Sequence, residues 1–154
     1  MDVVIGIAEK IVLSCIITIG WCLMFTLPKP YIRHAMLVTA VGVGIKYSML
    51  NAEIHLAVST FFGAMVGSFL GVYFAQQCKL PPKALIVPSL ICMMPGITAY
   101  KAMVSMVQIG YFGFSMDLFV LMMSYFFDAI FVISALVLGL SIPGILFYRR
   151  KPIV

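Results

Sequence analysis

A proline–glycine pair interrupts an apolar stretch near the middle of the chain, and polar side chains follow it at once. The stretch reads Cys92-Met93-Met94-Pro95-Gly96-Ile97-Thr98-Ala99-Tyr100-Lys101. Pro95 cannot donate a backbone hydrogen bond and Gly96 relaxes the backbone, so a helix is expected to break here. Such a break inside a membrane leaves amides and carbonyls unpaired unless protein or water satisfies them.

The second half of a broken helix directs its unpaired amides, and partial positive charge, towards the break. Thr98 and Tyr100 would add hydroxyl groups there, and Lys101 a full positive charge. Transporters use this arrangement to hold an anionic group of the substrate. We therefore predict a carboxylate-binding site formed by Pro95, Gly96, Thr98, Tyr100 and Lys101. The alternative is a kinked helix that serves packing alone, because proline and glycine are frequent in transmembrane helices.

Isolated charges within apolar segments are the second candidate. Asp128 lies about 16 Å into its predicted helix at 1.5 Å per residue, close to the centre of a bilayer. Ionisable groups at that depth are costly, and they pair or face a water-filled path. Asp128 is therefore expected either to form an ion pair with Lys46 or Lys101, or to carry a coupling proton.

Two glycine motifs concern helix packing and movement. Gly63, Gly67 and Gly71 recur every four residues, so they share one helix face on which another helix can approach closely. That neighbour is either a helix of the same chain or one of a partner subunit. Pro143 and Gly144, near the end of the last apolar run, predict a hinge or a helix that merely loosens there.

Metal, cofactor and catalytic patterns are missing from the sequence. The four cysteines form no CxxC pair, and the two histidines are not at ligand spacing. The sequence contains no Ser-His-Asp, HExxH, P-loop or GxGxxG pattern. We expect no metal site, no cofactor and no enzymatic activity.

The elements that position these residues follow from composition. Of the 154 residues, 64% are hydrophobic and 10% are charged, too little polar surface for a soluble enzyme or a nucleic-acid-binding module. A span needs roughly 20 residues. The sequence thus predicts an all-α integral membrane protein with one polytopic domain, 1–154. About five spans are expected, over 3–27, 31–50, 55–75, 84–107 and 118–148, the fourth broken at Pro95-Gly96. The alternative is four spans, with 31–50 lying in the interface.

Basic residues indicate the orientation of the five-span arrangement. They gather at the first loop, the third loop and the carboxyl end: Lys29, Arg33, Lys79, Lys83, Arg149, Arg150 and Lys151. The opposite side carries none, which places the carboxyl end in the cytoplasm and the amino end in the periplasm. The first segment lacks a basic region and a cleavage site, so it is expected to remain as an anchor.

Two segments carry a resemblance to a known family. Met94-Pro95-Gly96-Ile97-Thr98-Ala99-Tyr100-Lys101-Ala102-Met103, together with Gly139-Leu140-Ser141-Ile142-Pro143-Gly144 and the basic tail, resembles the threonine/serine exporter family. The likeness covers essentially the whole chain. It matches Pro95, Gly96, Ala99 and Tyr100, and then Pro143 and Gly144, whereas Lys101 and Asp128 fall outside both motifs.

The resemblance implies an exporter subunit of the bacterial inner membrane. The chain looks like the second of two membrane domains, and a separate larger subunit, YjjP-like, would supply the first. The substrate implied for such split pairs is succinate, and single-chain relatives are associated with threonine and serine. We therefore expect a two-component secondary exporter of small carboxylates, surrounded by lipid and without a nucleic-acid partner.

Alternatives to this function remain open. The chain is either a transporting subunit for succinate, one for threonine or serine, or an accessory scaffold whose partner holds the whole site. Five helices are few for alternating access, so association of several copies of the chain also stays open. The absence of a nucleotide-binding motif favours transport driven by an ion or substrate gradient.

Overall fold

A computed structural model describes residues 2–148, and every regular element in that range is a helix. The elements in chain order are α1 (Asp2–Met24), α2 (Lys29–Asn51), α3 (Leu56–Cys78), α4 (Pro82–Leu90), the short 3-10 helix η1 (Ile91–Met93), α5 (Gly96–Phe112) and α6 (Met116–Tyr148). The all-α prediction is confirmed.

Proline and left-handed residues set the connections between helices. Pro28 precedes α2 and Pro30 lies in its first turn, where a missing amide costs nothing. Lys79 ends α3 in the left-handed conformation, and Gly113 turns the chain between α5 and α6 with φ of 88°. Only glycine adopts that last conformation without strain.

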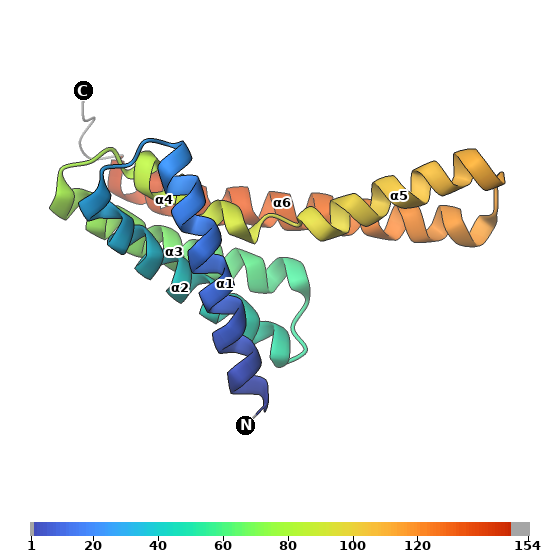
Figure 1. The fold of residues 1–154 in the computed structure, drawn as a ribbon, viewed down its shortest axis with the longest axis horizontal. Coiled ribbons are helices and arrows are strands. Elements are labelled where there is room, and N and C mark those ends of the chain that lie inside the picture. Colours follow the sequence, from blue (N-terminus) through green and yellow to red (C-terminus); the bar gives the residue numbers. More distant parts are fainter. Residues whose placement is uncertain (1, 149–154) are drawn as a thin grey trace.

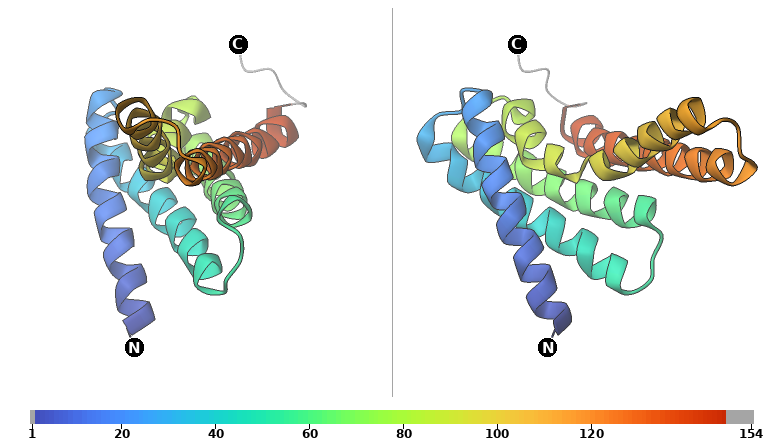
Figure 2. Two further views of the ribbon diagram at one scale, coloured as in Figure 1. Left: turned by 90° about the vertical axis from the view of Figure 1, so that its right-hand side faces the viewer. Right: turned by 45° about the vertical axis from the view of Figure 1, so that its right-hand side comes forward.

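The helices form a bundle with one projecting arm. Helix α3 packs between α2 and α6, while α1 packs on α2 and α4 fills the space against α1, α2 and α3. Helix α5 packs mainly on the first half of α6, and these two helices extend beyond the bundle as an antiparallel pair (Figure 1). We call this pair the α5–α6 arm; the turned views in Figure 2 show it leaving the bundle from the side of α4.

One end of the bundle carries the cations that the sequence assigned to a single side. The turns α1–α2 and α3–α4 lie together there (Figure 1), joined by a small apolar cluster that includes Leu27, Ala35, Ala75 and Leu85. The loops and helix starts at this end bear Lys29, Arg33, Lys79 and Lys83. The other three cations of the count, Arg149, Arg150 and Lys151, lie outside the described residues. The sidedness in the membrane remains a prediction.

Membrane-spanning capacity is clear for part of the bundle. Helices α1, α3 and α6 are long and apolar enough to cross a bilayer, and the bent pair formed by α4–η1 and α5 raises this number from three to four. Helix α2 does not meet that criterion by composition, although α1 and α3 cover much of it. The prediction of five spans is therefore not confirmed.

Two predicted boundaries were wrong by several residues. The segment 108–115 was expected to be a connection, but α5 continues to Phe112 and only 113–115 is non-helical. Helix α3 likewise extends to Cys78 through residues expected in a turn. In both places the helix continues until a residue in the left-handed or positive-φ region stops it, Gly113 or Lys79, whatever the polarity before it.

Candidate functional site

The helix break lies where the sequence predicts it, between η1 and α5. Helix α4 tightens into η1, Met94 and Pro95 are non-helical, and α5 begins at Gly96. The two helical parts meet at an angle of 52°. Because the helix stops, the carbonyls of its last turn lose their intrahelical partners.

Two side chains on one face of α2 donate to carbonyls at this break. The Thr39 hydroxyl donates to the Ser89 carbonyl at 2.8 Å, and the Lys46 ammonium donates to the Met93 carbonyl at 3.3 Å. Thr39 and Lys46 are seven residues apart, two turns of a helix, so they share a face. The hydroxyl of Thr18 on α1 lies 2.9 Å from that of Thr39 and extends the polar contact across three helices.

Sequence reasoning missed Thr39 and Thr18. Both are fully buried, as is Ser89. The available signal was the spacing of Thr39, Gly42 and Lys46 on α2, which combines two donors with a glycine on one stripe. Nothing local in the sequence shows that this stripe faces a residue fifty positions away.

Close backbone approach explains the glycines beside the break. A Cβ on Gly42 would lie 2.8 Å from Met93 Cε, and a Cβ on Gly63 would lie 2.7 Å from the Gly42 carbonyl oxygen. Gly67 and Gly71 face Leu90 and Ile86 of α4 in the same way. The structure thus places the predicted glycine face of α3 against α2 and α4 of its own chain.

The amino end of α5 is open. The Gly96 amide bonds the Met94 carbonyl at 2.9 Å, whereas the amides of Ile97 and Thr98 have no backbone acceptor among the described residues. A Cβ added to Gly96 would meet nothing within 4 Å, and its φ is not in the left-handed region. Neither packing nor backbone conformation within this chain requires glycine there.

Other predicted site residues surround that open end. Tyr100 is 68% exposed, and the Lys101 ammonium lies 5.4 Å from the centre of the Tyr125 ring of α6, a cation–π contact. Thr98 is half-buried. Among residues 2–148, the amino end of α5 thus offers two amides without a backbone acceptor, with Thr98 and Lys101 in the first two turns of the helix.

The predicted ion pairs of Asp128 are not brought together. Asp128 is half-buried on α6, and within residues 2–148 no ion pair joins it to Lys46 or Lys101. Lys46 contacts the Met93 carbonyl and Lys101 the Tyr125 ring instead. A coupling role for Asp128 or Lys46 remains a prediction.

The Pro143-Gly144 motif lies inside α6, which continues through it to Tyr148. Pro143 is buried, and the Ser68 hydroxyl of α3 donates to the Leu140 carbonyl one turn earlier at 3.3 Å. A hinge at this position remains a prediction.

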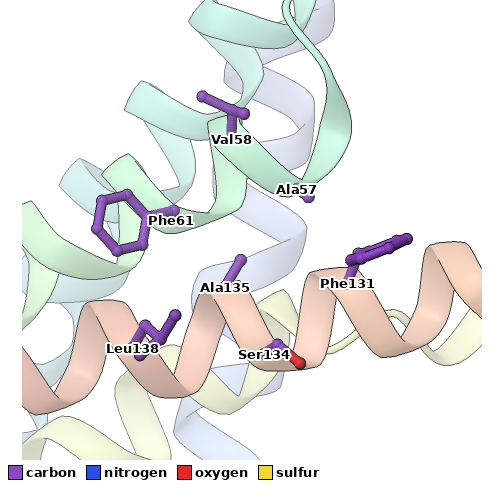
Figure 3. A pocket seen from close by; sticks show the side chains of 7 residues that line it. All are labelled: Ala57, Val58, Phe61, Phe131, Ser134, Ala135 and Leu138. Carbon is purple, nitrogen blue, oxygen red and sulfur yellow. The ribbon is translucent and has the colours of Figure 1, made fainter.

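A shallow apolar depression between α3 and α6 is a poor candidate for a carboxylate-binding site (Figure 3). It is lined by Ala57, Val58, Phe61, Phe131, Ser134, Ala135 and Leu138. Its one polar side chain is Ser134, and Figure 3 shows that hydroxyl pointing away from the α3 side chains. Such a surface accommodates an acyl chain, not a carboxylate. No group of three potential metal ligands occurs in the described part of the chain.

A helical bundle with a span broken at a proline–glycine pair is an arrangement that many membrane transporters use. The sequence model of the family described as "Threonine/Serine exporter, ThrE" matches residues 10–146 of this chain. The chain belongs to this exporter family.

A relative without an assigned function gives a second comparison. The chain is 40% identical to a protein of Haemophilus influenzae over 141 residues, which cover 92% of this chain and 48% of that protein. The chain thus spans about half the length of the curated relative it matches. No solved structure matches the chain.

Proposed function

We propose that the chain is the small, YjjB-type subunit of a two-component secondary exporter, and that the amino end of α5 binds a carboxylate of the substrate. The break at Met94–Pro95 carries this proposal. Within residues 2–148 it leaves the Ile97 and Thr98 amides without a backbone acceptor, about one helical turn before Lys101. Amides at a helix start and a nearby cation together favour a carboxylate.

Succinate is the proposed substrate, and threonine or serine is the alternative. All three carry a carboxylate that the α5 amides could accept, so the proposed site does not separate them by itself. The family description favours threonine and serine. The likeness to split exporters, on the Pro95–Tyr100 and Pro143–Gly144 motifs, favours succinate. The inner membrane of a bacterium is the proposed location.

A larger subunit is the proposed partner. The Haemophilus influenzae relative is about twice as long as the matched region, so there a second segment of similar length accompanies it. Gly96 faces open space and Tyr100 is exposed, so the described residues do not enclose the α5 amides, and a partner could cover them. The same openness supports the second candidate function, a scaffold that presents α5 to a site held mostly by its partner.

Gly96→Leu tests the site without disturbing the chain. Its side chain enters the open space at the amino end of α5, where no atom of the described residues lies within 4 Å of an added Cβ. We expect export of labelled succinate or threonine from cells to fall, with unchanged amounts of protein in the membrane. Gly20→Leu on α1, where a Cβ also meets nothing, is the matched control.

Lys101→Ala removes the cation and leaves the backbone amides. Hydrogen bonds to charged groups contribute about 1.5–3 kcal/mol each, so export should fall roughly tenfold to a hundredfold. Lys10→Ala, an exposed lysine of α1, should leave export unchanged. Normal export by both Gly96→Leu and Lys101→Ala, with normal assembly, would place the substrate site outside this chain and favour the scaffold.

A further inference from the structure

Lys46 is an ionisable side chain buried inside the bundle. It is 9% exposed, and its ammonium donates to the Met93 carbonyl at 3.3 Å. Among residues 2–148 no carboxylate lies within ion-pair distance of it. Burying a charge without an opposite charge is expensive in protein and more so in a bilayer. A structural role alone would be filled as well by a neutral donor such as glutamine.

The Lys46 ammonium lies at the carbonyl end of a broken helix, the kind of position at which transporters bind a coupling cation. The carbonyl end of a helix carries partial negative charge, and transporters with broken helices bind their coupling cation at such carbonyls. Here the carbonyl end belongs to η1, directly before the break, and the ammonium of α2 occupies it. Unlike a metal ion, an ammonium gives up its charge by releasing a proton.

The ionisable groups around Lys46 in the described part of the chain are thiols. Cys92 of η1 directly precedes Met93, whose carbonyl the ammonium contacts, and it interacts electrostatically with Lys46 and with Cys15 of α1. On α3 the neighbour is Gly63, where an added Cβ would lie 3.2 Å from Lys46 Cβ. Met94, directly after the Met93 carbonyl, is 54% exposed, so the chain reaches the surface next to the carbonyl that the ammonium contacts.

We propose that Lys46 is the proton-coupling residue of the exporter, an inference that rests on the proposed transport function. A proton from outside binds the Lys46 amine, and the resulting ammonium holds the Met93 carbonyl. Release of that proton to the cytoplasm leaves a neutral amine, and the charge-assisted bond becomes a weaker neutral one. Proton entry is thereby coupled to substrate exit.

Coupling and packing roles are separated by three variants of Lys46. Lys46→Gln keeps a donor for the Met93 carbonyl but never carries charge. Lys46→Arg keeps the charge but does not release its proton at physiological pH. Lys46→Met removes both charge and donor. Lys10→Met, an exposed lysine on α1, is the matched control.

Two fluxes are measured in cells that express the chain with its partner subunit and are loaded with labelled succinate or threonine. The first is net efflux with and without an imposed inward proton gradient. The second is exchange of labelled for unlabelled substrate without a gradient. For Lys46→Gln and Lys46→Arg we expect gradient-driven efflux to fall about tenfold and exchange to stay within about twofold of the unsubstituted protein.

Three results would overturn the inference. Full stimulation of Lys46→Gln by the gradient would show that the lysine need not titrate. Equal loss of efflux and exchange in Lys46→Gln and Lys46→Arg, at normal membrane abundance, would assign Lys46 to binding or packing. An unsubstituted protein that exports either probe without regard to the proton gradient would refute coupling while the transport function stood. Export of neither probe would instead refute the proposed function.

Discussion

The Thr39 hydroxyl contacts carbonyl oxygens of two different helices. Its one hydroxyl hydrogen is within donating distance of two carbonyl oxygens, that of Ala35 in its own helix at 3.0 Å and that of Ser89 in α4 at 2.8 Å. The side chain is fully buried. It therefore satisfies a carbonyl near the break, at a site that water does not reach.

Thr39→Val should destabilise the protein while preserving its shape. The substitution leaves the Ser89 carbonyl with the Cys92 thiol, a weaker donor at 3.4 Å, in place of the hydroxyl. Loss of a buried hydrogen bond of this kind should lower the free energy of unfolding by about 1–3 kcal/mol. Thermal unfolding in mild detergent would measure the loss. Ser141→Ala is the control, because Ser141 is exposed and bonds only the Val137 carbonyl of its own helix. Equal unfolding temperatures for the two variants would contradict the role of Thr39.

At the scale of helices, α3 is the element on which the others assemble. Its glycine face meets α2 and α4, and another part of its surface meets α6. On that second surface a Cβ added to Gly139 of α6 would lie 2.9 Å from the Phe61 carbonyl oxygen. Helices that approach this closely gain dispersion contacts, the main attraction between helices in lipid.

Gly63→Ala should separate α2 from α3. The new Cβ would lie 2.7 Å from the Gly42 carbonyl oxygen, a backbone atom that cannot swing away. Overpacking of this kind typically costs about 1–3 kcal/mol, so we expect the free energy of unfolding to fall by about that amount. Gly20→Ala, which meets nothing, should be neutral or stabilising by up to about 1 kcal/mol because alanine favours helix. Equivalent stability of the two variants would argue against the close contact.

At the scale of the whole molecule, the α5–α6 arm leaves a large apolar surface uncovered. Met103, Met106 and Val107 of α5 are each more than 60% exposed, and Phe127 and Phe131 of α6 more than half. The same arm carries Lys101 and Asp128, which lipid would not tolerate well. A protein surface on the arm would satisfy both observations.

A photo-crosslinking phenylalanine analogue in place of Met106 should capture the larger subunit. Met106 is 67% exposed on the arm, and Val12 on α1, which is 58% exposed, provides a control position expected to meet lipid. Peptide sequencing of the crosslinked product by mass spectrometry identifies the neighbour. A product that contains peptides of this 17.0 kDa chain alone would indicate a second copy instead. Crosslinking from Val12 but not Met106 would contradict the arm as the interface.

The sequence predicted features that depend on neighbouring residues, and it missed those that depend on helix rotation. The break at Pro95-Gly96 was predictable because proline and glycine act on their own turn. Thr39 was not, because its partner Ser89 lies on another helix and either face of α2 could have met it. The partner of Asp128, Lys46 or Lys101 or a proton, could not be chosen from the sequence for the same reason: depth in a helix was readable, but its facing side was not.

The length of α6 makes bilayer thickness a variable of the system. Thirty-three residues at 1.5 Å per residue extend about 50 Å, well beyond a hydrocarbon core of ~30 Å. A helix so mismatched tilts strongly, and the tilt changes when the lipid tails change. Because α5 is held mainly by α6, a thicker or thinner bilayer would also reorient the amino end of α5. Transport in vesicles of graded acyl-chain length should therefore pass through an optimum.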